Sequence, residues 1–123
     1  MPVTTNNFIT AEPDPIQTTN DYAAAASLDA GPWKCVSYTI HNTVVDFDSN
    51  GDPVGNSLKW TVFAANASDY SDEVPVKAEA TVLLDAVDTY AVLQAPYRYY
   101  RVQVKSASSD EPATAVVRGI AKQ

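Results

Sequence analysis

Apolar and polar residues alternate along much of the chain, a pattern typical of β-strands that bury one face. In residues 33–41 the inward positions are Val36, Tyr38 and Ile40, and in residues 58–65 they are every second residue from Leu58. Between them, Val44, Val45 and Phe47 lead into a polar stretch. The pattern predicts a strand over each of the two segments.

Three later segments continue the alternation. Residues 95–106 place Tyr100, Val102 and Val104 on one face, and residues 114–121 form a last strand. Residues 74–84 alternate too, but Val76, Ala80, Leu83, Leu84 and Val87 also fit one face of a helix. A strand is favoured there because the rest of the chain is rich in strands, and the helix stays open as an alternative.

The first twenty residues follow neither period. They are polar, contain three prolines and predict an extended arm, with Phe8 and Ile9 as its anchor if it docks on a neighbour. In residues 21–31, Asn20 and Gly31 could bound a short helix, and a strand remains the alternative. The expected division is residues 1–32 as arm and lead-in segment and residues 33–123 as one β-sandwich domain.

The fold class follows from the spacing of these strands. Clusters of Asp, Asn, Gly, Ser and Pro separate them, and no long helical pattern competes. This arrangement predicts an all-β protein, an antiparallel β-sandwich of the jelly-roll kind with an extended N-terminal arm. A chain of 123 residues is the size of one such domain.

Charge is unevenly distributed along this domain. The formal net charge is −7, with 3 basic and 13 acidic residues in residues 1–90 but 5 basic and 2 acidic residues in residues 91–123. The excess of carboxylates opposes binding to nucleic acid or to an anionic membrane. The asymmetry suits either pairing within one molecule or head-to-tail contact between copies.

Cysteine content and hydropathy indicate the cellular compartment in which the chain is made. Cys35 is the single cysteine, so no disulfide can form within the chain. The first twenty residues lack the basic and apolar regions of a signal peptide, and no stretch of about 18 apolar residues occurs. We therefore expect a soluble chain made in the cytoplasm.

The stretch DFDSNGDPVGN raises the question of a metal. Asp46, Asp48, Asn50 and Asp52 have the spacing of the first ligands of a calcium loop. Position twelve of that loop, which needs a bidentate glutamate, is Ser57. Because Asn50-Gly51 is a favoured hairpin turn, we expect a turn between strands and no cofactor.

Other reactive residues do not form a convincing catalytic set. Cys35 and His41 fall on the same face of one predicted strand, about 20 Å apart, too far to act as nucleophile and base. Paired carboxylates occur at Asp72-Glu73, Asp85/Asp88 and Asp110-Glu111, all in expected loops, where solvation is the ordinary role of charge. The sequence predicts no enzyme.

An outward row on the strand of residues 95–106 is the main candidate site. Tyr97, Tyr99 and Arg101 share this face. Exposed tyrosines beside arginine can anchor a protein interface or stack on sugar rings. Aromatic residues at such positions can equally stabilise the sheet by pairing across strands.

The closing strands also carry a resemblance. YRYYRVQVKS followed by AVVRGIAK, together with SYTIHNT and SLKWTVFAANAS, resembles the strands of small β-sandwich structural proteins of tailed bacteriophages. The similarity covers residues 33–122 and consists of strand texture without a catalytic or ligand motif. DFDSNGDPVG departs from the pattern and is expected to be an exposed loop.

This resemblance implies a virion protein assembled in the host cytoplasm. Such proteins include capsid decoration and cement proteins that bind the assembled head. It implies contacts with the major capsid protein, other virion proteins or sister copies, through Phe8 and Ile9 or through Tyr97, Tyr99 and Arg101. The alternative it leaves is a carbohydrate-binding or adhesion module of a tail or fibre.

Overall fold

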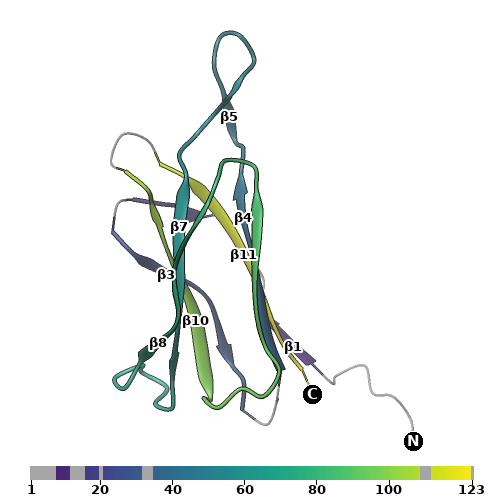
Figure 1. Cartoon of the computed structure of the whole chain (residues 1–123), viewed down its shortest axis with the longest axis vertical. Helices are drawn as coiled ribbons and strands as arrows, with labels where there is room; N and C mark the ends of the chain where they lie inside the picture. Colours follow the sequence, from purple (N-terminus) through teal and green to yellow (C-terminus); the bar gives the residue numbers. More distant parts are fainter. Residues whose placement is uncertain (1–7, 12–15, 20, 32–34, 109–111, 123) are drawn as a thin grey trace, which may run out of the picture.

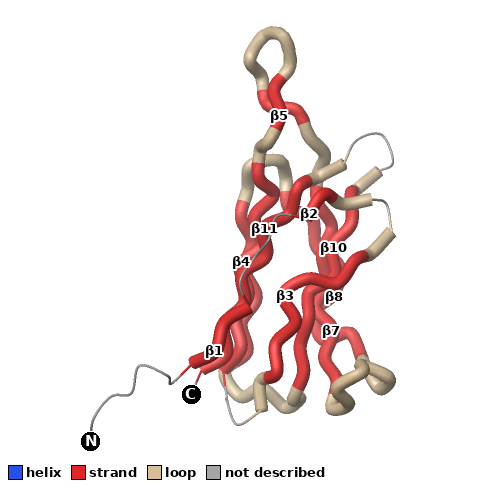
Figure 2. The backbone as a smooth tube through the Cα atoms, turned by 180° about the vertical axis from the view of Figure 1, so that it is seen from behind, coloured by secondary structure: helices blue, strands red, loops and turns tan. Residues whose placement is uncertain are grey.

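The chain folds into two antiparallel sheets packed face to face, as Figure 1 and Figure 2 show in this computed structural model, which describes residues 8–11, 16–19, 21–31, 35–108 and 112–122. The predicted all-β antiparallel sandwich is confirmed. The strands are β1 (Phe8–Ala11), β2 (Ile16–Gln17), β3 (Ala23–Asp29), β4 (Cys35–Thr43), β5 (Asp46–Phe47), β6 (Pro53–Val54), β7 (Leu58–Ala65), β8 (Val74–Val82), β9 (Val87–Val92), β10 (Tyr99–Ser106) and β11 (Thr114–Lys122).

The two sheets have different members. Sheet A has the order β1-β11-β4-β9, with β2 also paired to β11. Sheet B has the order β3-β10-β7-β8. Figure 2 shows β1, β4 and β11 in one layer and β3, β7, β8 and β10 in the other. A third, two-stranded sheet, β5-β6, is a hairpin that projects beyond one end of the sandwich (Figure 1).

The core lies between the sheets and is built from the inward positions of the alternating strands. The buried alternation of β4, β7, β10 and β11 matches the sequence prediction, including Tyr100, Val102 and Val104. The largest fully buried side chains are Trp60, Tyr38, Tyr100, Ile40, Leu58, Val36, Val62, Val102, Val104, Val117 and Asn42. Burial of these aromatic and branched side chains is the main force that holds the sheets together.

Polar side chains also connect the sheets. The Tyr38 hydroxyl on β4 donates to the Ala26 carbonyl on β3 at 2.8 Å. The Trp60 indole Nε1 on β7 donates to Asp88 Oδ2 on β9 at 3.1 Å. Each bond satisfies a polar group at the end of a buried ring and fixes the position of one sheet over the other.

The segment of residues 21–31 is a strand, so the short helix considered from sequence is wrong. Its alanines favour a helix locally, but β3 buries Ala25 and Leu28 in the core and pairs with β10. The register shifts between Tyr100 and Val102, where Ala26 adopts a φ of +51° and forms a bulge. Tertiary burial and sheet pairing here override helix propensity.

The segment that could be strand or helix is also a strand. β8 pairs with β7 from Val74 to Val82, so the favoured prediction is confirmed and the helical alternative is wrong. The sequence missed β9, which starts at Val87 and pairs in unbroken register with β4. Asp88 therefore lies on a strand and not in a loop, and its side chain is held by Trp60.

The N-terminal segment contributes strands to the sandwich. β1 pairs with β11 through Phe8↔Lys122 to Ala11↔Gly119, and β2 pairs with the start of the same strand. Residues 8–11 are therefore paired within their own chain and do not project as an arm. Strands that precede residue 33 enter both sheets, and the division at residues 32 and 33 stays a prediction. The described residues form no helix that could cross a membrane.

Candidate functional site

The outer face of sheet B carries a fixed cluster of aromatic and charged side chains. Arg101 on β10 donates from Nε and Nη2 to Glu73 Oε2 at 3.1 and 2.8 Å. Its guanidinium carbon lies 4.2 Å from the centre of the Tyr70 ring, and the Tyr99 ring centre lies 6.1 Å from that of Tyr70. We call Tyr70, Glu73, Tyr99 and Arg101 the Tyr70–Arg101 cluster.

The loop between β7 and β8 positions Tyr70 in this cluster. Asp72 accepts hydrogen bonds from the Asn66 and Ala67 amides, which closes the loop. Tyr70 takes the left-handed φ of +60°, and its hydroxyl donates to the Tyr100 carbonyl at 2.9 Å. Partial burial raises the pKa of Tyr70 above its ordinary value.

A second ion pair borders the cluster at the end of β3. Arg98 donates from Nε and Nη2 to the two oxygens of Asp29 at 3.0 and 3.2 Å, and its guanidinium carbon lies 5.2 Å from the Tyr99 ring centre. The hydrogen bonds from Arg98 lower the pKa of Asp29, and the same bonds raise that of Arg98. An arginine therefore lies over each of the Tyr70 and Tyr99 rings.

Charge pairing continues along the same face of sheet B. Glu79 on β8 lies 3.5 Å from the Lys59 amine and 3.6 Å from the Lys105 amine, and it accepts a hydrogen bond from the Tyr22 hydroxyl. That bond is the main cause that lowers the pKa of Glu79. Lys105 also lies 4.5 Å from the centre of the Tyr22 ring. The face thus carries charges that are matched within the chain.

The structure places the predicted site residues in different positions. Tyr99 and Arg101 lie together on the outer face of sheet B, as the alternation predicts. Tyr97 precedes β10 and packs against the core, with its ring edge-on to that of Tyr100 at 6.4 Å. It therefore belongs to a different surface. Phe8 and Ile9 lie on β1, at the other side of the molecule in sheet A.

The hairpin contains the residues of the possible calcium loop. Asp48 Oδ1 accepts the amides of Asn50 and Asp52 at 2.8 and 3.0 Å, and Asp46 Oδ1 accepts the Phe47 amide. The predicted hairpin is confirmed, but the expected Asn50-Gly51 centre is wrong. The Gly51 amide bonds to the Asp48 carbonyl, which centres the turn on Ser49 and Asn50, and among the hairpin residues only Gly51, at +82°, has positive φ.

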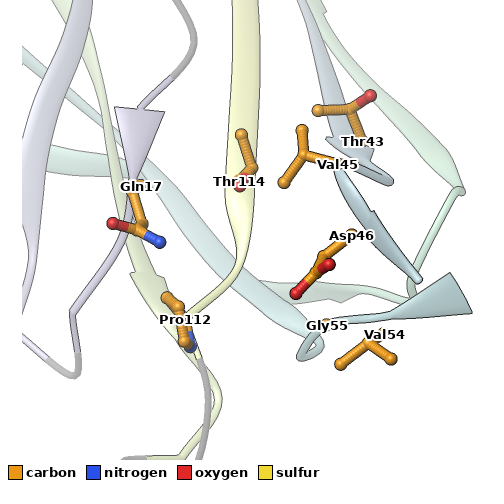
Figure 3. Close-up of a pocket in the computed structure, with 8 residues that line it drawn as sticks. All are labelled: Gln17, Thr43, Val45, Asp46, Val54, Gly55, Pro112 and Thr114. Carbon is orange, nitrogen blue, oxygen red and sulfur yellow. The ribbon is translucent and has the colours of Figure 1, made fainter. Parts of the chain in front are cut away.

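A pocket of about 260 Å³ lies at the base of this hairpin (Figure 3). Its lining combines hydroxyl, amide and aliphatic groups with the single carboxylate of Asp46. The lining residues are Gln17, Thr43, Val45, Asp46, Val54, Gly55, Pro112 and Thr114. The set offers hydrogen-bonding groups but no pair of acid and base.

The other candidate reactive groups have separate structural partners. Cys35 and His41 lie near opposite ends of β4, where the Cys35 thiol donates to the Leu93 carbonyl and His41 Nε2 lies 3.5 Å from Asp85 Oδ1. Glu73 pairs with Arg101. Asp110 and Glu111 lie outside the described residues, and the described part of the chain contains no group of three His, Cys, Asp or Glu side chains placed to share a metal.

Sequence reasoning missed the partners of the cluster. Tyr70 and Glu73 come from a loop about thirty residues before β10, and alternation along one strand cannot identify them. The available signal was the loop NASDYSDEVP itself, in which one tyrosine stands among polar residues. Packing against a neighbouring strand buries the apolar surface of such a ring and stabilises its position.

Comparison with known proteins identifies the fold. The sequence matches no protein-family model and no curated protein. PBSX exported protein XepA superposes with a TM-score of 0.62 at 10% identity, over 98% of this chain and 39% of that chain.

In two further solved structures, this chain aligns with all or nearly all of the matched chain. The SPBc2 prophage-derived protein YomS has a TM-score of 0.52 at 9% identity, over 99% of this chain and 100% of that chain. A structure described as Bacillus endospore appendages that form disulfide-linked pili has a TM-score of 0.51 at 8% identity, over 99% and 96%. At these identities the likeness is one of fold: the chain has the β-sandwich fold that these three proteins share.

Proposed function

We propose that this chain is a non-enzymatic structural protein of a phage particle, a capsid decoration or cement protein that binds the assembled head. The observation that carries the proposal is the Tyr70–Arg101 cluster. Its aromatic rings and arginine are held before any partner arrives, so little side-chain entropy is lost on binding. The shared fold with a prophage-derived protein supports the phage assignment.

Binding by this surface would stabilise a particle through mass action. A protein that binds the assembled shell and not the free coat subunits shifts assembly toward the shell, by an amount set by its concentration and affinity. No bond is made or broken, and no cofactor takes part. The proposed partners are the major capsid protein, other virion proteins and sister copies, in a virion assembled in the host cytoplasm.

The contacts of the two tyrosines favour a protein partner over a sugar. Arg101 lies 4.2 Å from the ring centre of Tyr70, and Arg98 lies 5.2 Å from that of Tyr99. A stacked sugar would have to displace these guanidinium groups from the rings. Glycan-array binding that disappears in a Tyr99→Ala variant would instead establish the alternative, a carbohydrate-binding module of a tail or fibre.

The direct test uses purified heads and the full chain. In co-sedimentation, Tyr99→Ala/Arg101→Ala should weaken binding at least tenfold, since both anchors of the surface are lost. Gln103→Ala is the matched control, because Gln103 lies on the same strand and face. Unchanged binding by the double variant, with its fold intact by circular dichroism, would refute the role of the cluster.

Phe8 and Ile9 are the second proposed contact and need a separate variant. Because β1 and β2 pair with β11, deletion of residues 1–20 would also remove strands from sheet A. Phe8→Ala/Ile9→Ala keeps the backbone pairing, and loss of head binding by this variant would support the contact. Full head binding by this variant would show that Phe8 and Ile9 do not form a contact.

The number of copies of this chain per particle distinguishes a decoration or cement protein from a tail, fibre or vertex component. Quantitative mass spectrometry of purified particles should find this chain at near-equal abundance with the major coat protein if it is a decoration or cement protein. A few copies per particle would indicate a tail, fibre or vertex component. Absence would refute the virion assignment.

A further inference from the structure

The edge strands of the two sheets differ in how well they are protected against pairing with another chain. β8, an edge of sheet B, contains Pro75 and Lys77 and has two register shifts against β7. β3, the other edge of that sheet, has a bulge at Ala26. Proline, lysine and bulges are the usual means by which proteins prevent an edge from accepting a further strand.

β9, an edge of sheet A, has none of these devices. Its six residues contain no proline and no lysine, and they pair with β4 without a register shift. The outward residues Val87, Thr89 and Ala91 are exposed, and Leu93 follows the strand directly. Val87 is 57% exposed and Leu93 is 77% exposed, so apolar side chains lie in solvent at both ends of the edge.

The charges near this edge do not oppose the approach of a second copy. Asp88 is the single charged residue of β9, and its carboxylate accepts a hydrogen bond from Trp60, on the core side of the sheet. The outward positions of β4, β9 and β11 carry no carboxylate, and Arg118 and Lys122 supply positive charge on β11. Two copies of a chain with net charge −7 can therefore meet here without opposing carboxylates.

We propose that β9 is a dimerisation edge, at which β9 of one copy pairs antiparallel with β9 of a second copy about a two-fold axis. Sheet A then continues through both molecules. Outward residues must pair with outward residues, since a shift of one residue would place opposite faces together. The proposal does not depend on the phage assignment, because it concerns only contact between copies of this chain.

The exposed apolar residues select the register. An axis through Tyr90 places Val87 of one copy opposite Leu93 of the other, twice, and places Thr89 opposite Ala91. An axis through Thr89 would place Val87 opposite Ala91 and leave Leu93 uncovered. The register about Tyr90 covers all four exposed apolar side chains and is therefore the one that we assign.

Sedimentation equilibrium of the full chain tests the dimer. The wild type should be dimeric, and Val87→Lys/Leu93→Lys should be monomeric at the same concentration. The matched control is Val45→Lys/Phe47→Lys, which exchanges two comparably exposed apolar residues at the β5-β6 hairpin and carries the same charge. It should remain dimeric. A wild type that is monomeric up to millimolar concentration, or a control that dissociates as the edge variant does, would overturn the proposal.

Disulfide cross-linking tests the register. In a Cys35→Ser background, Thr89→Cys and Ala91→Cys chains are oxidised separately and as a mixture. The mixture should give a disulfide-linked dimer with one chain of each kind, identified by mass, and neither chain alone should link. Cross-linking of the Thr89→Cys chain with itself would overturn the register about Tyr90.

Discussion

The outer faces of the two sheets use the same strand geometry to present opposite surfaces. On sheet B the outward residues are charged and aromatic, and their charges are matched within the chain, as Arg101 with Glu73 shows. On sheet A the outward residues are mainly hydroxyl and aliphatic side chains, with Arg118 and Lys122 as exposed cations. Both inward rows are mainly apolar, so the main difference between the sheets lies on their outer faces.

The largest expected effect comes from breaking the core that supports both faces. A Cβ at Gly119 would lie 2.6 Å from Tyr38 Cε1 and 3.0 Å from Leu28 Cδ1. The Tyr38 ring is buried and its hydroxyl is bonded to Ala26, so it cannot move aside. Gly119→Ala should lower the free energy of unfolding by about 2–3 kcal/mol, measured by urea denaturation.

Gly55→Ala is the control for that substitution. Its Cβ would meet Leu84 Cδ1 at 2.8 Å, but this atom is the end of a flexible, half-buried side chain at the base of the hairpin. The cost should stay below about 1 kcal/mol. Equal losses from both variants would mean that the clash with Tyr38 is not the cause.

The next effect separates the two faces directly. Arg101→Ala removes the ion pair with Glu73 and the packing on Tyr70, at a site where the two charged side chains are only 25% and 23% exposed. It should destabilise the protein by about 1 kcal/mol. Arg118→Ala, on sheet A, should change stability by less than about 0.5 kcal/mol, because Arg118 has no ion pair within the described ranges.

Thermal unfolding of both arginine variants checks this contrast. A larger loss from Arg118→Ala than from Arg101→Ala would contradict the view that the matched charges of sheet B add to stability while Arg118 does not.

The faces illustrate what alternation can and cannot predict. The inward positions of β4, β7 and β10 followed from period two, because a buried row needs apolar residues at every second place. β9 did not, since Val87, Asp88 and Tyr90 alternate weakly and Asp88 is an inward carboxylate that only the indole of Trp60 explains. β3 was left open between helix and strand, because its alanines favour a helix until β10 is placed beside them.

The candidate site shows the same limit. Tyr99 and Arg101 were predictable as an outward pair from their own strand. Their partners Tyr70 and Glu73 were not, because a loop brings them there and loop geometry depends on contacts such as the bond from Tyr70 to Tyr100. Tyr97 was misplaced for a related reason: β10 begins only at Tyr99, so the alternation does not extend back to residue 97.

A smaller effect concerns acid sensitivity on sheet B. The hydrogen bonds from Arg98 lower the pKa of Asp29, so this pair stabilises the fold above the unfolded pKa of about 4 and loses that contribution as pH falls through the folded value. Asp29→Asn should therefore lower the melting temperature slightly at pH 7 and not at pH 2. About half of the Asp29 side chain is exposed, which keeps the effect small. A difference that grows toward low pH would have the wrong sign.

Calcium binding would make the β5-β6 hairpin a third ordered surface beside the outer faces of the two sheets. We expect no calcium binding. Asp48 Oδ1 already accepts the amides of Asn50 and Asp52, and a metal would have to replace bonds that hold the turn. Calorimetric titration with calcium should release no heat, and the melting temperature should not change. Saturable heat that is lost in Asp52→Asn, whose carboxylate forms none of the described turn bonds, would instead establish a metal site. In that case the acidic hairpin would be a metal-binding surface in addition to the charged face of sheet B.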